Sequence, residues 1–118
     1  MKRRKFDTVL KSVAELFRVM SHPDRVRLLG LLHQHHELDV SQLHGALEIS
    51  QSAASQHLKL LKLQGLVLER REGHHVYYRL KNEQIKELIT SAIEYQAQDE
   101  QTNRESRALL KEMNALLH

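Results

Sequence analysis

Apolar residues recur at helical spacing in separate stretches of the chain, and this pattern predicts a largely helical fold. The first stretch covers residues 6–20, and the second covers residues 25–32 after a break at 21–24. Pro23 suits the first position of a helix, and Asp24 suits the electropositive first turn. We therefore expect an amphipathic first helix and a second, more apolar helix that is buried in the middle of the domain.

Two shorter helices are predicted next, joined by a tight turn. The third lies near residues 40–47, where Asp39 and Gln42 have the spacing of a capping box. The fourth covers residues 51–64 and stops at Gly65, because glycine adopts the left-handed conformation that ends many helices. Such a pair of helices is typical of a helix-turn-helix.

Alternating side chains after the fourth helix predict a β-hairpin. Residues 66–72 and 75–80 form its strands, and Gly73 lies in the turn. In the second strand, apolar and polar side chains alternate with the period of two that a half-buried strand requires. A hairpin directly after the helix-turn-helix makes the expected fold a winged helix-turn-helix, mainly α with a small β-hairpin.

The C-terminal third contains two apolar stripes that are out of register. Asn82 is a suitable cap for a fifth helix, whose stripe fades into polar residues at 96–107 and returns at 109–117. At the helical pitch, the second stripe is rotated by roughly 240° from the first. We expect a break near 99–102 and a separate terminal helix; one long helix over 83–117 is the alternative.

The chain has the composition of a single small domain. It holds 118 residues with a formal net charge of +3, and 41% of them are hydrophobic. We expect residues 1–98 to form a winged helix-turn-helix domain for DNA binding and dimerisation, and residues 99–118 to be a C-terminal helical extension of it. There are no cysteines, which excludes disulfides and thiolate metal sites.

No segment suggests secretion or membrane insertion. No apolar run approaches the roughly 18 residues that span a bilayer, and no apolar signal core follows the basic residues 2–5. We therefore predict a cytoplasmic protein without membrane contact. The basic residues 2–5 suit either a flexible arm that contacts phosphates or a solvated tail.

One face of the predicted fourth helix carries small polar side chains and a lysine. At about 100° per residue, Ala54, Leu58 and Leu61 form its inner face. The outer face holds Ser52, Ser55, Gln56 and Lys59. Short hydroxyls let a helix lie deep in the major groove of DNA, where Gln can bind adenine and Lys can reach guanine or a phosphate. An ordinary solvated helix face is the alternative.

Other residues extend this candidate surface. Gln51 lies in the first turn, where amides point at phosphates, and His57 lies nearer the core edge, which suits packing or a phosphate-side position more than base reading. The hairpin adds cationic side chains that suit contacts with phosphates or the minor groove, and Arg71 and His74 at its tip are the favoured contacts. The alternative is that these charged side chains only keep an exposed sheet edge solvated. The predicted DNA-binding residues are Gln51, Ser52, Ser55, Gln56, His57, Lys59, Arg70, Arg71, His74 and Arg79.

Several motifs together resemble the ArsR/SmtB family of bacterial repressors. They are residues 21–29, 50–61, 65–67, 70–73 and 76–80, within a resemblance that covers residues 6–98. The resemblance implies a winged-helix homodimer paired through the first and fifth helices, which binds double-stranded DNA at an imperfect palindrome in a promoter and is released by a chemical signal. The wide apolar stripes of these two helices independently favour a symmetric dimer.

The usual metal sites of this family are not matched. Many metal-sensing members have two cysteines at the start of the third helix, where this chain has Asp39 and Ser41, which cannot replace soft thiolate ligands. Other members bind zinc through the fifth helix, but none of the residues at those positions is a normal zinc ligand. These residues are Asn82, Gln84, Tyr95 and Gln98. We predict no metal and no cofactor, and the inducer stays undefined.

Four histidines leave one alternative open, a sensor with a non-standard metal site. His33, His35 and His36 cluster at the end of the second helix, and His44 is expected nearby. Imidazoles suit zinc, copper and nickel, but histidines at a helix C-terminus also interact favourably with the helix dipole. A solvated polar turn is therefore the favoured interpretation.

The sequence does not indicate an enzyme. It lacks a thiol nucleophile and, with four glycines in all, a glycine-rich phosphate loop. Ser55 and His57 lie roughly 200° apart on one helix and cannot act as nucleophile and base. The main alternative function is a winged helix that binds a protein partner. Steep salt dependence of DNA binding would distinguish a DNA-binding regulator from such a module.

Overall fold

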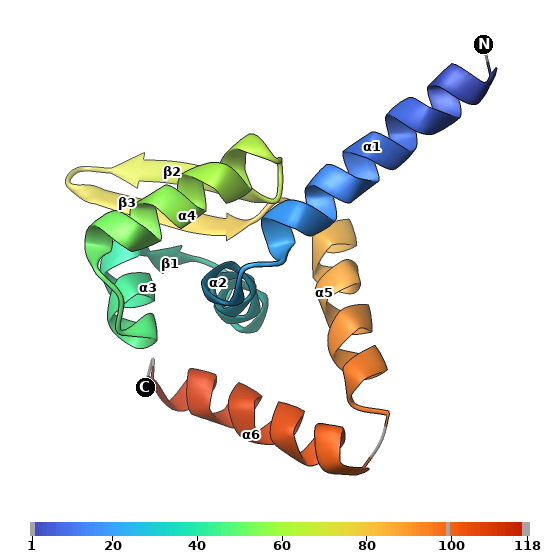
Figure 1. Cartoon of the computed structure of the whole chain (residues 1–118). Coiled ribbons are helices and arrows are strands. Elements are labelled where there is room, and N and C mark those ends of the chain that lie inside the picture. Colours follow the sequence, from blue (N-terminus) through green and yellow to red (C-terminus); the bar gives the residue numbers. More distant parts are fainter. Residues whose placement is uncertain (1, 99, 117–118) are drawn as a thin grey trace.

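The computed structural model of the chain describes residues 2–98 and 100–116. Its elements follow in the order α1 (Lys2–Met20), α2 (Pro23–Gln34), β1 (Leu38–Asp39), α3 (Val40–Leu47), α4 (Gln51–Leu63), β2 (Val67–Glu72), β3 (His75–Leu80), α5 (Glu83–Gln96) and α6 (Glu100–Leu116), as Figure 1 shows. The fold is mainly α-helical with a small sheet, as the hydrophobic pattern predicts. Within the described residues, we find no helix with the length and apolar character needed to cross a bilayer.

Side-chain caps fix the starts of two helices at the expected positions. Asp39 accepts a hydrogen bond from the Ser41 amide, and the Gln42 side chain accepts one from the Asp39 amide at 3.0 Å. The Asp39 side chain also accepts from the Gln42 amide, which completes the capping box of α3. Asn82 caps α5 by accepting a hydrogen bond from the Ile85 amide at 3.0 Å. Local sequence therefore sets where these helices begin.

The small sheet has the antiparallel strand order β1-β3-β2. The hairpin of β2 and β3 lies where the alternation predicts it, and Gly73 adopts a positive φ of 61° in its turn. The short strand β1 pairs Leu38 with Tyr78 and Asp39 with Tyr77. Two residues are too few to show an alternating pattern, which is why the sequence does not reveal β1.

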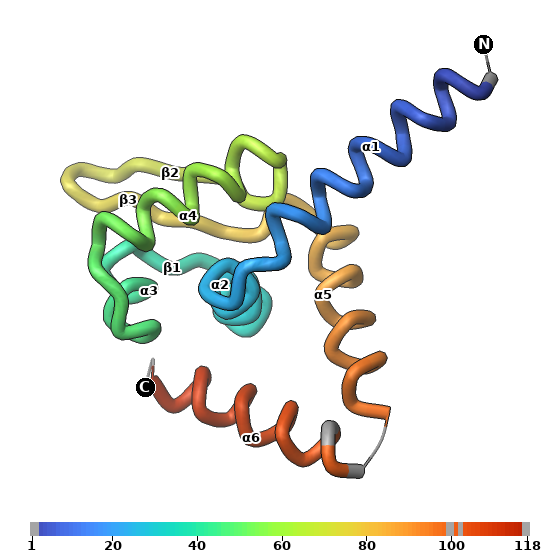
Figure 2. Tube along the Cα trace, viewed as in Figure 1, coloured from blue at the N-terminus to red at the C-terminus, as the bar shows by residue number. Residues whose placement is uncertain are grey.

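Helix α2 lies at the centre of the molecule. Figure 2 shows it almost end-on, with α3 and α4 on one side and α5 on the other. Four leucines on two successive turns of α2 are buried, which confirms its expected central position. They are Leu28, Leu29, Leu31 and Leu32. Because α2 contacts α1, α3, α4, α5, α6 and β3, it joins the helix-turn-helix to the C-terminal helices.

The C-terminal third forms two separate helices, as expected, although α6 already begins within the stretch 99–102 where the break is predicted. Helix α5 ends at Gln96 and α6 begins at Glu100, and α6 turns back below α2 in the view of Figure 1. Met113 of α6 is buried against Gly30 of α2, where a Cβ atom would lie 2.8 Å from Met113 Cε. Leu117, the last residue of the predicted apolar stripe, lies outside the described residues.

Helix α1 begins earlier than its apolar stripe predicts. It starts at Lys2, so the basic residues 3–5 lie on a helix and do not form a flexible arm. The N-terminal part of α1 projects away from the other helices in Figure 1. Val19 is buried, but the stripe before it is open to solvent, with Phe6 64% and Val9 60% exposed.

Candidate nucleic-acid interface

The polar face of α4 is open to solvent. Its inner residues Ala54, Leu58 and Leu61 are fully buried against the core. The outer residues Gln51, Ser52, Gln56 and Lys59 are exposed, and Ser55 is half-buried. The division into an inner and an outer face therefore agrees with the helical wheel. Nothing within the described part of the chain covers the outer face.

The β2–β3 hairpin (residues 67–80) is the wing of the fold. The wing and α4 together border a surface depression of about 240 Å³. Residues from the end of the wing meet residues of α4 at its edge. Those among the predicted DNA-binding residues are Gln51, Ser55, Lys59, Arg71 and His74. The fold thus gathers hydroxyl, amide and cationic groups from two elements on one side of the molecule.

A carboxylate holds Arg71 in place. Arg71 Nε donates a hydrogen bond to Glu69 Oε1 at 3.1 Å, while Tyr78 Oη donates to Glu69 Oε2 at 2.7 Å. Lys62 Nζ of α4 lies 3.6 Å from Glu69 Oε1. The hydrogen bond from Tyr78 lowers the pKa of Glu69. Burial raises this pKa by less, and Arg71 lowers it further. Glu69 therefore joins the wing to α4 and orients Arg71, whose side chain stays 73% exposed.

Arg70 and Arg79 lie on the other face of the hairpin. Cross-strand partners share a face, and the register pairs Arg70 with Tyr77 and Leu68 with Arg79, whereas Arg71 pairs with Val76. The guanidinium of Arg70 lies 4.5 Å from the centre of the Tyr77 ring.

Two carboxylates also bind Arg70. Arg70 Nη2 lies 2.6 Å from Glu37 Oε1, and Nη1 lies 2.6 Å from Glu72 Oε2. The hydrogen bond to Glu37, and then the one to Glu72, raise the pKa of Arg70. Arg70 thus binds the wing to the segment before β1, and the structure does not bring it together with α4. No local pattern in the sequence indicates this use of Glu37, since Glu37 and Arg70 meet only through the sheet.

His57 points toward α2 and not along the outer face of α4. Its ring centre lies 4.5 Å from that of His22, and its Nε2 lies 3.9 Å from Asp24 Oδ2. Burial, reinforced by His22 and Arg25, lowers the pKa of His57. This position matches the packing interpretation of His57, which fixes α4 against the start of α2.

His22, Asp24 and His57 form the one group of three close metal-ligand side chains among the residues described. His22 Nδ1 accepts a hydrogen bond from the Asp24 amide at 3.1 Å, which caps α2. A neutral imidazole that accepts at Nδ1 carries its proton on Nε2, so neither nitrogen offers a free lone pair. The group is therefore a helix cap with a packed histidine. Its members are distant in sequence, and their spacing does not reveal it.

The four histidines considered as a metal site do not form a group of three close ligands. His33 Nε2 lies 2.6 Å from Thr90 Oγ1 of α5, and His44 Nδ1 lies 3.2 Å from the Ile49 carbonyl oxygen. Burial, and then Lys86, lower the pKa of His33. His33 joins α2 to α5, and His44 supports the turn before α4.

Comparison with known proteins identifies the family. Residues 22–68 match the family described as "Bacterial regulatory protein, arsR family". The chain is 38% identical over 81 residues to the transcriptional repressor PagR of Bacillus anthracis, which covers 68% of this chain and 80% of PagR. It is 40% identical over 74 residues to the transcriptional activator HlyU of Vibrio cholerae, which covers 63% of this chain and 68% of HlyU.

Solved structures show the same fold. HlyU from Vibrio cholerae superposes with a TM-score of 0.68 at 35% identity, over 75% of this chain and 95% of HlyU. A possible ArsR-family regulator from Mycobacterium bovis superposes with a TM-score of 0.68 at 32% identity, over 73% of this chain and 79% of that one. That structure is described as a homodimeric winged helix-turn-helix DNA-binding domain.

The fold, the exposed polar helix and the relatives agree. The matched region contains α2 to α4 and reaches into β2, which are the elements that build the helix-turn-helix. The related proteins are transcriptional regulators, a class without enzymatic activity. The chain therefore belongs to the arsR family of bacterial regulatory proteins and is a DNA-binding transcriptional regulator.

Proposed function

We propose that the chain represses transcription by binding, as a homodimer, to a palindromic site in a promoter. The observation that carries this proposal is the open polar face of α4, bordered by Arg71 and His74 of the wing. Such a helix fits the major groove while the wing reaches the adjacent backbone. Its place of action is then the cytoplasm, where bacterial DNA lies.

Each predicted residue takes a part that suits its position. Ser52, Ser55, Gln56 and Lys59 face the base edges, and Gln51 faces a phosphate near the start of α4. Arg71 and His74 contact the backbone or the minor groove. Arg70 and Arg79 lie on the other face of the wing and contact only flanking phosphates. His57 positions α4 by packing against the start of α2.

The exposed stripe of α1 supports the dimer. Phe6, Val9 and Phe17 are 64%, 60% and 57% exposed, which is unusual for large apolar side chains in one row of a helix. On α5, Tyr95 is 68% exposed. Pairing of α1 and α5 across a two-fold axis would bury these side chains and present α4 twice. Two such helices about 34 Å apart would enter successive major grooves on one side of the DNA.

Selection and salt titration test the DNA-binding part of this proposal. Bound fragments are selected from bacterial genomic DNA, and the affinity for the selected site is compared with that for a shuffled duplex of equal length. We expect a palindromic site with a preference of about 10³ or more over the shuffled duplex. The affinity should fall steeply between about 50 and about 200 mM salt. A protein-interaction module would show neither property.

Transcription in vitro tests the direction of regulation. HlyU is named an activator and PagR a repressor, so both directions occur among the relatives. We expect transcripts from the selected promoter to decrease as the protein is added. An increase would contradict repression and leave the DNA-binding part of the proposal intact.

A further inference from the structure

The two neighbouring arginines of the wing use their guanidinium groups in different ways. Arg70 binds Glu37 through Nε and Nη2 and binds Glu72 through Nη1, so each of its nitrogen atoms has a carboxylate partner. Arg71 binds Glu69 through Nε alone, at 3.1 Å. Within the described residues, we find no hydrogen bond from its two Nη groups. Arg71 can therefore bind a phosphate without giving up a bond within the protein.

The partner of Arg71, Glu69, is held from three sides. Tyr78 Oη donates a hydrogen bond to Glu69 Oε2 at 2.7 Å, and Lys62 Nζ, in the last turn of α4, lies 3.6 Å from Oε1. Tyr78 lies directly opposite Glu69 in the sheet and is only 4% exposed. The Glu69 carboxylate is thus fixed between the core, α4 and Arg71, and it gives Arg71 a fixed point of attachment.

Charge alone does not explain a carboxylate at this place. Glu69 lines the depression between α4 and the wing, together with Lys59 and His74. A negative charge there repels the phosphates of DNA. The Glu69 side chain is only 15% exposed, however, and both of its oxygens already accept hydrogen bonds. Such a carboxylate suits an internal support more than a contact with DNA.

We propose that Glu69 is a positioning residue for DNA binding, which holds Arg71 so that its two Nη groups meet a phosphate of the DNA backbone. The bond at Nε leaves the Nη edge of the guanidinium, and this edge matches two phosphate oxygens. A long side chain loses rotamer freedom when it is immobilised at an interface, and Glu69 removes part of that freedom beforehand. The inference rests on the proposed contact between Arg71 and DNA.

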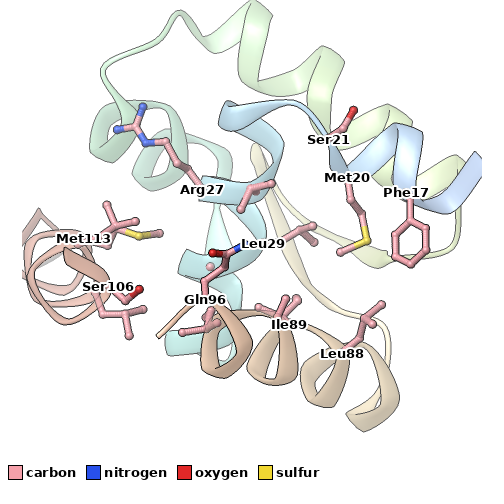
Figure 3. A pocket seen from close by; sticks show the side chains of 16 residues that line it. Phe17, Met20, Ser21, Arg27, Leu29, Leu88, Ile89, Gln96, Ser106 and Met113 are labelled. Atoms are coloured by element: carbon pink, nitrogen blue, oxygen red, sulfur yellow. The ribbon is translucent and has the colours of Figure 1, made fainter. Parts of the chain in front are cut away.

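Glu69 lies apart from the surface of the proposed dimer. Figure 3 shows the apolar groove bordered by α1, α2, α5 and α6, with Phe17, Leu88 and Met113 among its side chains. This groove shares no lining residue with the depression at Glu69. A substitution of Glu69 should therefore leave the dimer intact, and a change in DNA affinity then reports on the wing.

Two substitutions on β2 test the sign of the effect on affinity for the selected DNA site. Glu69→Gln keeps the shape of the side chain but has no charge and one carbonyl oxygen. Glu72→Gln removes the same charge where the side chain is 70% exposed, and Glu37 still holds Arg70 there. If charge alone mattered, both variants would bind DNA more tightly.

We expect opposite results from the two variants. Glu72→Gln should bind the selected site equally well or more tightly than the parent, and Glu69→Gln should bind it about fivefold more weakly. Tighter or unchanged binding by Glu69→Gln would overturn the proposal. Equal weakening by the two variants would also overturn it, since the effect would then not depend on the contact with Arg71.

The salt dependence of binding separates positioning from a loss of folded protein. Glu69→Gln should reduce the slope of log affinity against log salt concentration by up to about 1, because a phosphate contact is weakened. A smaller folded fraction would weaken binding without changing this slope. Circular dichroism and sedimentation equilibrium check that the variant is folded and dimeric. Weaker binding with an unchanged slope would overturn the proposal.

Arg71→Lys keeps the proposal testable if Glu69→Gln does not fold, because the Arg71 side chain is 73% exposed. Lysine keeps the charge but lacks the planar fork that binds a carboxylate and a phosphate together. We expect Arg71→Lys to weaken binding about fivefold, as Glu69→Gln does. Parent-like binding by Arg71→Lys would show that only charge is needed and would overturn the proposal.

A double-mutant cycle tests whether Glu69 acts through Arg71. In an Arg71→Ala chain, Glu69→Gln should cause no further weakening. The same loss with and without Arg71 would overturn the proposal, and so would parent-like binding by Arg71→Ala, because no contact would then exist to be positioned. Failure of the parent chain to prefer the selected site over the shuffled duplex would instead contradict the proposed function, and with it this inference.

Discussion

The imidazole ring of His57 in α4 lies 4.5 Å from the ring of His22, the residue that caps α2. The two rings are tilted by 48°, and Asp24 lies beside them. This contact fixes α4 against the start of the central helix α2. It also places a histidine where protonation is unfavourable, because burial, and then His22 and Arg25, lower the pKa of His57.

Stability should therefore decrease in mild acid. The pKa values of His33 and His57 are lowered in the folded chain, by burial first in both cases. The unfolded chain takes up protons near the usual histidine pKa of about 6.5. As the pH falls below that value, the unfolded state binds more protons than the folded state, and the free energy of unfolding falls with it.

Urea denaturation at a series of pH values measures this effect. We expect the midpoint to fall between about pH 7.5 and about pH 5.5. The double variant His33→Gln and His57→Gln should show a flatter dependence than the parent. A parallel dependence in both proteins would show that these two histidines are not responsible.

Tyr78 should ionise only at high pH. Burial, and then the hydrogen bond to Glu69, raise the pKa of Tyr78 to about 12. Since this value lies above the usual tyrosine pKa of about 10, its contribution to stability is complete below about pH 10 and is lost as the pH rises through about 12. The near-ultraviolet absorbance of tyrosinate follows this step.

Tyr78→Phe should abolish the late ionisation step and lower the free energy of unfolding by about 1–2 kcal/mol, since a buried hydrogen bond to a carboxylate is lost. Tyr95→Phe is the matched control, because the Tyr95 side chain is 68% exposed. It should retain the late step. If that step persists without Tyr78, the Glu69 contact does not set it.

Gln56 and Arg71 should affect DNA binding in different ways. Gln56→Ala removes an exposed amide from α4 and should relax preference at one base pair by about 1–3 kcal/mol. Arg71→Ala should weaken binding to all sequences alike and reduce the salt slope by about 1. Competition binding with single-base variants of the selected site separates the two effects. Parent-like binding by both variants would contradict the proposed docking.

Polar substitutions in the α1 stripe should dissociate the dimer. Val9→Ser with Leu10→Ser removes two exposed apolar side chains, which are 60% and 48% accessible in the single chain. Sedimentation equilibrium should show monomers at concentrations where the parent is dimeric. Lys11→Ser, on the same helix but outside the stripe, should remain dimeric. Retention of the dimer in the double variant would move the interface away from α1.

Local features explain why much of the fold is predictable. The capping box of Asp39 and Gln42 and the cap at Asn82 depend on residues three apart, so the sequence displays them directly. The inner face of α4 follows from helical periodicity alone. The break between α5 and α6 is visible in the sequence because the apolar stripes on its two sides cannot lie on one face of a single helix.

Features that depend on distant contacts are not visible in the sequence. The strand β1 exists only because β3 pairs with it, and Arg70 binds Glu37 only because that strand brings them together. The meeting of His22 with His57 depends on the packing of α2 against α4. Periodicity shows that α6 has an apolar stripe, but only the structure shows that this stripe packs on Gly30 of α2 through Met113.

The central position of α2 makes it a shared support for both ends of the fold. One end of this helix holds α4 through His22 and Asp24, and its middle packs against Met113 of α6 at Gly30. A displacement of α2 would therefore move the base of α4 and the seat of the C-terminal helix together.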